Sequence, residues 1–212
     1  MKTVRLVVVT GAAGGMDALI VRRLLANGDT VFATDTSEEA LSKWRASVAK
    51  DADLPTLPAD NSDEASCNSL AGLVREKVRR VEVLDNCAGY FPTPPFDEMT
   101  LADWSKVIGI NLTGVFLMTR AMLPLMKRRG WGRIINMGSG SMFEGVAEQV
   151  HYVAAKAGVL GFTRSLARVV GGDGITVKAA LGKPDPSTFY GVGPKGYTDY
   201  PPSAARSVAP SA

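Results

Sequence analysis

The sequence predicts a doubly wound α/β fold, with a parallel sheet of about six strands between two layers of helices, making three layers in all (α/β/α). Two observations support this prediction. Short runs rich in Val and Ile alternate along the chain with longer amphipathic stretches. The apolar runs do not alternate with polar residues, which is typical of parallel strands that helices cover on both faces.

The expected elements follow one another as strand and helix. Strands are expected at residues 4–9, 30–34, 54–57, 81–84, 132–137 and 175–180. Helices are expected at about residues 14–27, 62–79, 100–128 and 150–170. Residues 1–182 are therefore expected to form one dinucleotide-binding and catalytic domain. Residues 183–212, which contain six of the twelve prolines, predict an irregular tail rich in Pro, Gly and Ser.

The composition argues against several classes of function. With 212 residues and 46% hydrophobic content, the chain is long enough for one globular domain with a sizeable core. The formal net charge of +3 is too small, and the basic residues are too scattered, to predict a nucleic-acid surface. Neither a signal-peptide pattern nor a run of about 18 apolar residues predicts membrane insertion. We therefore expect a small-molecule partner.

The cysteines and the single histidine predict no metal site. Cys67 and Cys87 form no CxxC pair, and His151 does not lie at a usual zinc spacing from either of them. This usage favours a reducing, cytoplasmic setting. His151, which is turned about 100° away from its neighbour Tyr152 on a helix, is expected at the surface or at an interface.

A glycine-rich loop follows the first expected strand and opens the first helix. Residues 10–17 read TGAAGGMD. Glycines at this place let the backbone approach a pyrophosphate held at the helix N-terminus. An ordinary glycine-rich turn remains the alternative for such a loop taken alone. The loop residues expected to contact a cofactor are Gly11, Gly14, Gly15 and Met16.

Asp35 ends the second expected strand, a little over 20 residues beyond the loop. A carboxylate at this place can accept hydrogen bonds from the adenosine ribose, and its charge would repel a 2′-phosphate. Thr36 and Ser37, which follow it, are neutral, so they supply no cation for such a phosphate. The sequence therefore favours NAD over NADP. A helix N-cap or a turn aspartate is the alternative role for Asp35.

Tyr152 and Lys156 are four residues apart on an expected helix and therefore project from one face. A nearby ammonium favours the phenolate, so we expect the pKa of Tyr152 to fall from its usual value of about 10. Alone, such a pair usually marks a solvated helix face.

The segments around this pair resemble the short-chain dehydrogenase/reductase family. Residues 132–139 read GRIINMGS and residues 152–158 read YVAAKAG, with the family's spacing from Ser139 to Tyr152. Asn111 in INLTGVF resembles the family's helix asparagine. Residues 86–89, NCAG, resemble its Asn-Asn-Ala-Gly turn beside the cofactor. The resemblance runs from about residue 4 to residue 180 and implies a Rossmann-type fold.

The resemblance implies a role for each matching residue. Tyr152 would be the general acid in ketone reduction and the general base in alcohol oxidation, and Ser139 would polarise the substrate oxygen. Lys156 would bind the nicotinamide ribose, and Asn111 would position a water that links Lys156 to solvent. Further cofactor contacts are implied for Asp60, with Asn61 beside it, and for Asn86, Ala88 and Gly89. The nicotinamide would carry the hydride.

The chain departs from the family pattern at four places. Asp17 stands where a glycine is usual, and Asp85 stands at an apolar strand position, where a buried carboxylate would be destabilising or would stay protonated. Cys87 replaces an asparagine, and residues 178–183 match neither the family's nicotinamide-binding turn nor its seventh strand. Two interpretations therefore stay open: a working oxidoreductase, and a truncated, catalytically impaired relative that only binds dinucleotide.

The substrate is expected to be a small carbonyl compound or alcohol. An apolar wall is expected from Tyr90, Phe91, Met142 and Phe143, as in the family's aryl-alcohol dehydrogenases and 3-oxoacyl reductases, although a rigid surface loop would carry the same residues. The family also builds one interface from its two long helices and another from its final strand. Because that strand is not recognisable here, we expect a homodimer.

Overall fold

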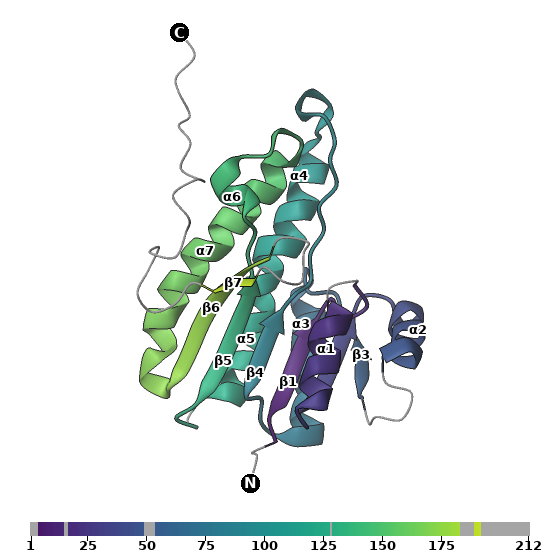
Figure 1. The fold of residues 1–212 in the computed structure, drawn as a ribbon, viewed down its shortest axis with the longest axis vertical. Coiled ribbons are helices and arrows are strands. Elements are labelled where there is room, and N and C mark those ends of the chain that lie inside the picture. Colours follow the sequence, from purple (N-terminus) through teal and green to yellow (C-terminus); the bar gives the residue numbers. More distant parts are fainter. Residues whose placement is uncertain (1–3, 15–16, 49–53, 128, 183–188, 192–212) are drawn as a thin grey trace.

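The computed structural model describes residues 4–14, 17–48, 54–127, 129–182 and 189–191; for Asp17 and residues 189–191 it describes the backbone alone. Seven strands form one sheet in the order β3-β2-β1-β4-β5-β6-β7. They span Leu6–Thr10 (β1), Thr30–Asp35 (β2), Thr56–Pro58 (β3), Val83–Asn86 (β4), Gly132–Met137 (β5), Ile175–Gly182 (β6) and Phe189–Gly191 (β7). Figure 1 shows the sheet with helices on its two faces.

The helices of the first half are α1 (Asp17–Ala26), α2 (Glu38–Val48) and α3 (Glu64–Val78). The second half contains α4 (Leu101–Ile108), the π-helical turn η2 (Gly109–Thr113), α5 (Gly114–Met126), α6 (Ser141–Glu144) and α7 (Val150–Val170). Three-residue 3₁₀ turns lie at Phe96–Glu98, Ala147–Gln149 and Gly171–Asp173. The expected helices are present. The helix α2, for which no expectation was formed, packs its buried Leu41 and Trp44 on the sheet.

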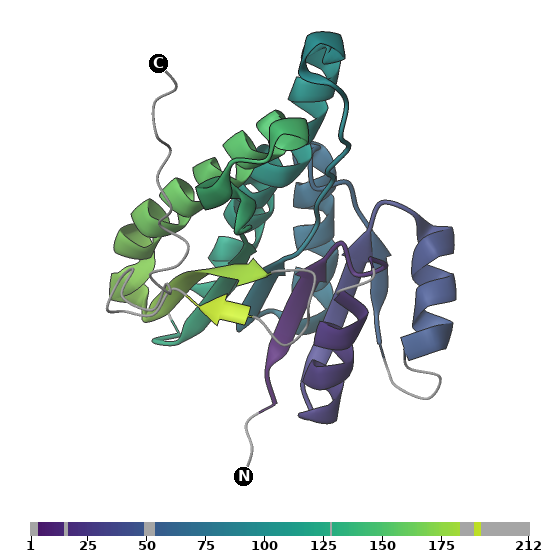
Figure 2. The same cartoon turned by 45° about the horizontal axis from the view of Figure 1, so that its top comes forward.

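The first six strands pair in parallel, which confirms the doubly wound α/β class with six parallel strands. The seventh is an addition. β7 pairs antiparallel with β6, so that Leu181 faces Tyr190, as the reversed arrow in Figure 2 shows. The expectation of an irregular segment from residue 183 onward was therefore wrong for these three residues, whose pairing is determined by the open edge of β6. The other residues beyond 182 lie outside the described part.

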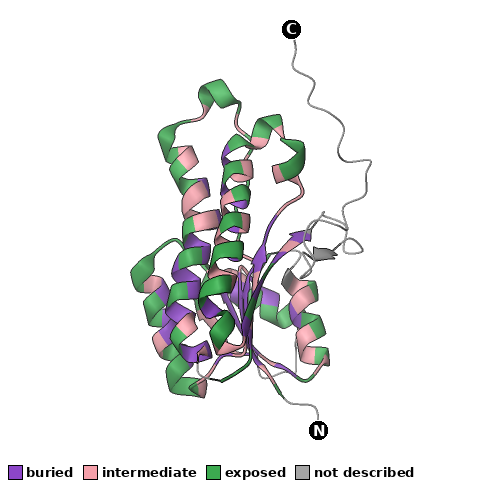
Figure 3. Ribbon diagram, turned by 90° about the vertical axis from the view of Figure 1, so that its left-hand side faces the viewer, coloured by how far each residue is buried: buried purple, intermediate pink, exposed green. Residues whose placement is uncertain are grey.

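Two apolar clusters hold the layers together, one on each face of the sheet. On one face Val8 and Leu84 meet Leu70 of α3 and Met118 and Met122 of α5. On the other face Val7, Val9 and Val31 meet side chains of α1 and α2. Successive residues of one strand thus enter opposite clusters, as the alternation of side chains along a strand requires. Figure 3 shows buried residues where the helices face the sheet and exposed ones on their outer sides.

The run from Leu101 to Met126 is one nearly continuous helix. Thr100 begins it with a capping box, in which its hydroxyl accepts from the backbone N–H of Asp103. This run is long and apolar enough to cross a membrane, with a mean hydropathy of 1.4, and it is the one described helix of which this holds. Nine residues of its second half, α5, are buried against α3 and the sheet, which accounts for its apolar composition.

His151 departs from its expected place. It is fully buried rather than at the surface, and its Nε2 has no hydrogen-bond partner among the described residues. The reason is that α7 packs against both α4 and the sheet, so the face that carries His151 turns inward as well.

Candidate active site

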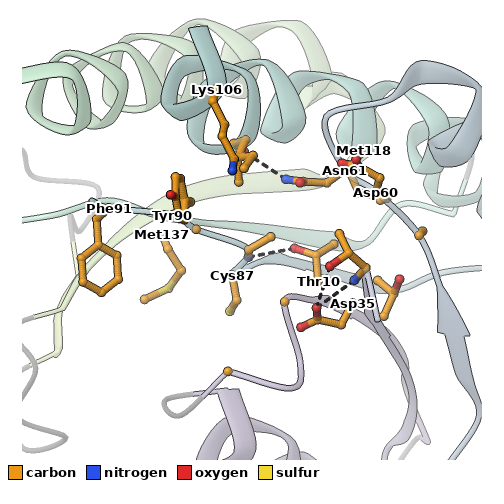
Figure 4. A pocket seen from close by; sticks show the side chains of 18 of the residues that line it. Thr10, Asp35, Asp60, Asn61, Cys87, Tyr90, Phe91, Lys106, Met118 and Met137 are labelled. Atoms are coloured by element: carbon orange, nitrogen blue, oxygen red, sulfur yellow. Dashed lines mark hydrogen bonds between the residues drawn. The ribbon is translucent and has the colours of Figure 1, made fainter. Parts of the chain in front are cut away.

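A cavity of ≈ 640 Å³ opens where the parallel strands end at their carboxyl side. Thr10, Asp35 and Met137, the last residues of β1, β2 and β5, line it. β1 and β4 are neighbours in the sheet, but the chain crosses from them to opposite edges, so the sheet has its topological switch point here. Ligands of open α/β sheets bind at such a point. Figure 4 shows the lining side chains between the loop after β1 and the helices above it.

The loop after β1 lies against the turn after β4. Gly11 has a φ of 69°, and a Cβ at this position would lie 2.6 Å from the Cα of Ala88. The backbone N–H of Ala88 donates to the hydroxyl of Thr10 over 3.1 Å. Both Gly11 and Ala88 line the cavity, so the glycine permits the close approach that shapes its floor.

Gly14 also lines the cavity, and its N–H donates to the carbonyl of Gly11 over 3.0 Å. Of the other residues expected to contact a cofactor from this loop, Gly15 and Met16 lie outside the described residues. The side chain of Asp17 does as well.

Asp35 holds its carboxylate at the cavity by two backbone hydrogen bonds. Its Oδ2 accepts from the N–H of Ala13 over 3.1 Å, and its Oδ1 accepts from the N–H of Thr36 over 2.8 Å. The N-cap alternative is wrong, because the hydroxyl of Ser37 accepts from the N–H of Ala40 at the start of α2. A carboxylate has about four lone-pair sites, so Asp35 retains acceptor capacity for ribose hydroxyls.

Asp60 and Asn61 line the cavity beside the end of β3. The Oδ1 of Asp60 accepts from both the N–H and the hydroxyl of Ser62, at 2.8 and 2.6 Å. The Nδ2 of Asn61 donates to the carbonyl of Ile110 over 3.0 Å. The amide of Asn61 thus links the β3 end to the π-helical turn η2, which limits what it can offer a ligand.

Among the described residues expected to contact a cofactor, Asn86 alone does not line the cavity, although Ala88 and Gly89 after it do. Its side chain is 2% exposed and donates to the hydroxyl of Thr119 and to Oδ1 of Asn136, at 3.1 and 2.8 Å. Asn136 in turn donates to Thr163 over 2.9 Å. Asn86 therefore belongs to a buried polar network that ties β4 and β5 to α5 and α7.

Tyr152 and Lys156 meet in the cavity wall as their spacing predicts. The Lys156 ammonium lies 5.4 Å from the centroid of the Tyr152 ring and donates to the carbonyl of Met137 over 2.7 Å. Burial raises the pKa of Tyr152, and a hydrogen bond with Ser139 lowers it by less. The expected fall in this pKa is therefore not found, because desolvation of the phenol outweighs the neighbouring groups.

Ser139 and Asn111, the other two residues expected to be catalytic, do not line the cavity. The Ser139 hydroxyl lies 2.8 Å from that of Ser141 and accepts from the N–H of Ser141 over 3.2 Å. Asn111 is fully buried in η2, where its Nδ2 donates to the carbonyls of Tyr90 and Val107 at 2.7 and 3.0 Å. Its Oδ1 accepts from the N–H of Tyr90 over 3.3 Å. Asn111 thus anchors the segment that follows the β4 turn.

Two of the four expected substrate residues reach the cavity. Tyr90 and Phe91 line it, and the Phe91 ring lies 5.8 Å from the ring of Tyr152. Met142 and Phe143, on α6, do not line it. They follow the Ser139 turn on a separate helix, and Phe143 is 41% exposed.

Several lining residues were not anticipated. They come from helices and strand ends distant in the sequence: Thr10, Thr34, Thr36, Ala59, Cys87, Lys106, Ile110, Met118, Met137 and Gly138. For Thr10 the signal was available, since it ends a strand before a glycine. Ile110 and Met118 belong to an apolar helical pattern in which nothing marks a cavity wall. Within the described residues, no group of three His, Cys, Asp or Glu side chains could hold a metal ion.

The residues present suit a nicotinamide dinucleotide. Gly11 allows the loop after β1 to pack against the turn at Ala88, and both residues line the cavity together with Asp35 at the end of β2. Asp85, behind this turn, is 5% exposed, and burial raises its pKa to about 6. The carboxyl group that the sequence predicts to be buried at this position is buried, and desolvation raises its pKa as expected.

Comparison with known proteins agrees with this geometry. Residues 5–183 match the short chain dehydrogenase family. Acetoacetyl-CoA reductase of Allochromatium vinosum is 38% identical over 176 residues, which cover 82% of this chain and 72% of that protein. Levodione reductase of Leifsonia aquatica is 36% identical over 181 residues, covering 84% of this chain and 68% of that protein.

Solved structures show the same relationship. A short chain dehydrogenase from Mycobacterium smegmatis superposes with a TM-score of 0.79 at 31% identity, covering 85% of this chain and 77% of that one. The crystal structure of levodione reductase gives 0.76 at 34% identity, covering 82% and 69%. Enzymes of this family are oxidoreductases that bind a nicotinamide dinucleotide. The chain, with the glycine loop, Asp35, Tyr152 and Lys156 around one cavity, belongs to the short-chain dehydrogenase/reductase family.

Proposed function

We propose that this protein is an NAD(H)-dependent oxidoreductase that interconverts an alcohol with a ketone or aldehyde. One observation carries the proposal: Asp35 and the Tyr152–Lys156 pair line the same cavity. A group that can bind an adenosine ribose and a pair that can exchange a proton therefore share one binding space. The similarity to proteins named as reductases supports the reaction class.

Asp35 supports NAD over NADP as the cofactor. Its carboxylate can accept hydrogen bonds from the two ribose hydroxyls, and a 2′-phosphate in their place would meet its negative charge. Thr36 lines the cavity beside it and is neutral. Gly11, Gly14, Asp60, Ala88 and Gly89 would complete the dinucleotide site by lining it.

The chain's own contribution to the reaction is orientation and proton transfer. The bound nicotinamide supplies the hydride chemistry. The raised pKa of Tyr152 keeps its Oη protonated, which is the state that can donate to a carbonyl oxygen. Ser139, whose hydroxyl lowers the pKa of Tyr152, would supply a second hydroxyl to the same substrate oxygen. Lys156 lies against the Tyr152 ring, where its charge favours the phenolate that is left.

The aromatic wall supports an apolar substrate. The Phe91 ring is 62% exposed and tilted by 58° relative to the ring of Tyr152, so it offers a face or edge directly beside the proton donor. A small carbonyl compound with an aryl or other apolar substituent fits this environment. A flexible hydrophilic substrate would leave the Phe91 surface in water.

The alternative is a relative that binds dinucleotide without turning over a substrate. The short last strand at the edge of the sheet favours this alternative. β7 has only three residues and runs antiparallel to β6, whereas the resemblance implies a seventh strand and a substrate lid. Residues 183–188, which connect the two strands, lie outside the described residues.

The proposed assembly is a homodimer through α5 and α7. Phe116 and Phe162 pack edge to face at 6.4 Å on the outer side of these helices. They border a groove that Leu123, Pro124 and Leu166 also line. Exposed apolar grooves of this kind mark association surfaces, and two-fold packing of the same face closes on itself.

The experiment that tests the function has two parts. Fluorescence titration with NADH measures binding, and a panel of aryl and aliphatic ketones, aldehydes and alcohols measures turnover. Binding together with turnover is expected. Binding without turnover across the panel would select the impaired alternative, and absence of NADH binding would contradict both.

A further inference from the structure

Lys106 is a cation on the cavity wall that the proposed reaction does not use. It belongs to α4, lines the cavity, and its side chain extends over Tyr90 (Figure 4). The glycine loop after β1, near Thr10, forms the opposite side of the cavity in the same view. An extended dinucleotide lying along the glycine loop would therefore have the Lys106 ammonium facing it.

The ammonium is held in place by the ring beneath it. Its Nζ lies 4.7 Å from the centroid of the Tyr90 ring, a cation–π distance. Tyr90 is itself fixed, because both its N–H and its carbonyl are hydrogen-bonded to the side chain of Asn111. Lys106 forms no ion pair within the described residues; its charge acts on Asp103, one turn earlier on α4, as the smallest of the influences that lower the pKa of that carboxyl. The charge is thus positioned but is not neutralised there.

The charged side chains that line the cavity provide no excess of positive charge to balance a bound pyrophosphate. Its described lining carries two carboxylates, Asp35 and Asp60, and two ammonium groups, Lys106 and Lys156. Lys156 is 3% exposed and directed to the carbonyl of Met137. A dinucleotide adds two negative charges with its pyrophosphate. The loop it would follow also leads into the acidic residue Asp17.

We propose that Lys106 binds the pyrophosphate of the dinucleotide from the wall opposite the glycine loop. This inference rests on the proposed dinucleotide site and adds a residue to it. A flexible lysine is suited to this task, because its charge approaches a phosphate oxygen as a point donor without a fixed plane. Lys106 is exposed, so the contribution of such a contact would depend on ionic strength.

The test compares ligands with and without the pyrophosphate. Lys106→Met keeps the apolar stem and removes the charge, and Lys106→Arg restores the charge. Lys77→Met, at an exposed position on α3 outside the cavity, is the control for a change in net charge. Dissociation constants for NADH and NADPH are measured by fluorescence, and those for ADP-ribose and adenosine by calorimetry, at about 0.05 and about 0.5 M NaCl.

Lys106→Met is expected to weaken NADH and ADP-ribose about threefold to tenfold at low salt, and to leave adenosine unchanged. Lys106→Arg should regain most of that affinity, and Lys77→Met should match the wild type. High salt should narrow the difference between the wild type and Lys106→Met.

Three results for Lys106→Met would overturn the inference. An equal loss of affinity for adenosine would mean that Lys106 contacts the adenosine instead. Unchanged binding of every ligand would mean that Lys106 contacts none of them, and a loss of affinity confined to NADPH would mean that it contacts the 2′-phosphate. If the wild type does not bind NADH, the proposed function fails as well. If the wild type binds NADH and Lys106→Met binds it with the same dissociation constant, only the proposed role of Lys106 is contradicted.

Discussion

The thiol of Cys87 donates a hydrogen bond to the carboxylate of Asp85, with Sγ 3.1 Å from Oδ1. Asp85 lies in β4 between Val9 of β1 and Ile135 of β5, in the interior of the sheet. Burial raises its pKa to about 6, and the bond from Cys87 opposes this rise. Two positions that depart from the family pattern thus contact each other, and the cysteine supplies a donor to a carboxylate that burial would otherwise disfavour.

The first prediction concerns Asp85→Asn and the pH dependence of stability. In the unfolded chain the carboxyl has an ordinary pKa of about 3.9, so between about pH 4 and pH 6 the folded chain binds more protons. Because of Asp85, the free energy of unfolding therefore falls as pH rises through this window. Above about pH 6 the carboxyl is charged in the folded chain, and its destabilising effect has reached its full size. Removing the charge should stabilise the protein by on the order of 3 kcal/mol at pH 8.

Urea unfolding at pH 5 and pH 8 checks this. The gain from Asp85→Asn over the wild type should be larger at pH 8 than at pH 5. Asp97→Asn, at an exposed acid of the turn Phe96–Glu98, is the control and should show no such difference. A gain that is equal at the two pH values would mean that Asp85 does not titrate in this range.

Tyr152→Phe should reduce turnover by about 10²-fold or more and leave the NADH dissociation constant nearly unchanged. The substitution removes the proton donor but keeps the ring that contacts Phe91 and Lys156. Steady-state rates on any substrate found in the panel, with NADH titration beside them, measure the two effects separately. Turnover close to that of the wild type would remove Tyr152 from the mechanism.

Asp35→Asn should change the choice of cofactor. The wild type is expected to bind NADH more tightly than NADPH. The neutral amide should reduce the ratio of the NADPH dissociation constant to the NADH dissociation constant by about tenfold. Asp60→Asn removes the other cavity carboxylate and should leave that ratio unchanged. Tighter binding of NADPH than NADH by the wild type would contradict the assignment of Asp35.

Phe162→Glu should convert the proposed dimer into a monomer. The charge would be placed in the groove beside Phe116, where association would bury it without a partner. Leu73→Glu, at a 42% exposed leucine of α3, is the matched control and should leave the dimer intact. Light scattering coupled to size exclusion measures both masses. A wild type that is a tetramer, or that is a monomer, would contradict the proposed assembly.

Much of the fold was predictable because its signals are local. The apolar runs identified all six parallel strands, and the helical periodicity identified the long helices that carry Asn111 and Tyr152. The strand β7 was not predictable, because a three-residue strand is defined by the edge of β6 on which it pairs. The burial of His151 was not predictable for a similar reason. Sequence spacing shows on which face of a helix a residue lies, but it does not show which faces of that helix pack against other elements.

The sequence by itself determined the residues whose chemistry depends on short spacing: the glycine loop, Asp35 at a strand end, and Tyr152 one helical turn before Lys156. Only the tertiary structure decided which distant side chains join them. It placed Lys106 over Tyr90, withdrew Asn86 into a network with Asn136, and buried Tyr152 enough to raise its pKa. The physical reason is that spacing determines direction along one element, whereas burial and charge contacts depend on the packing between elements.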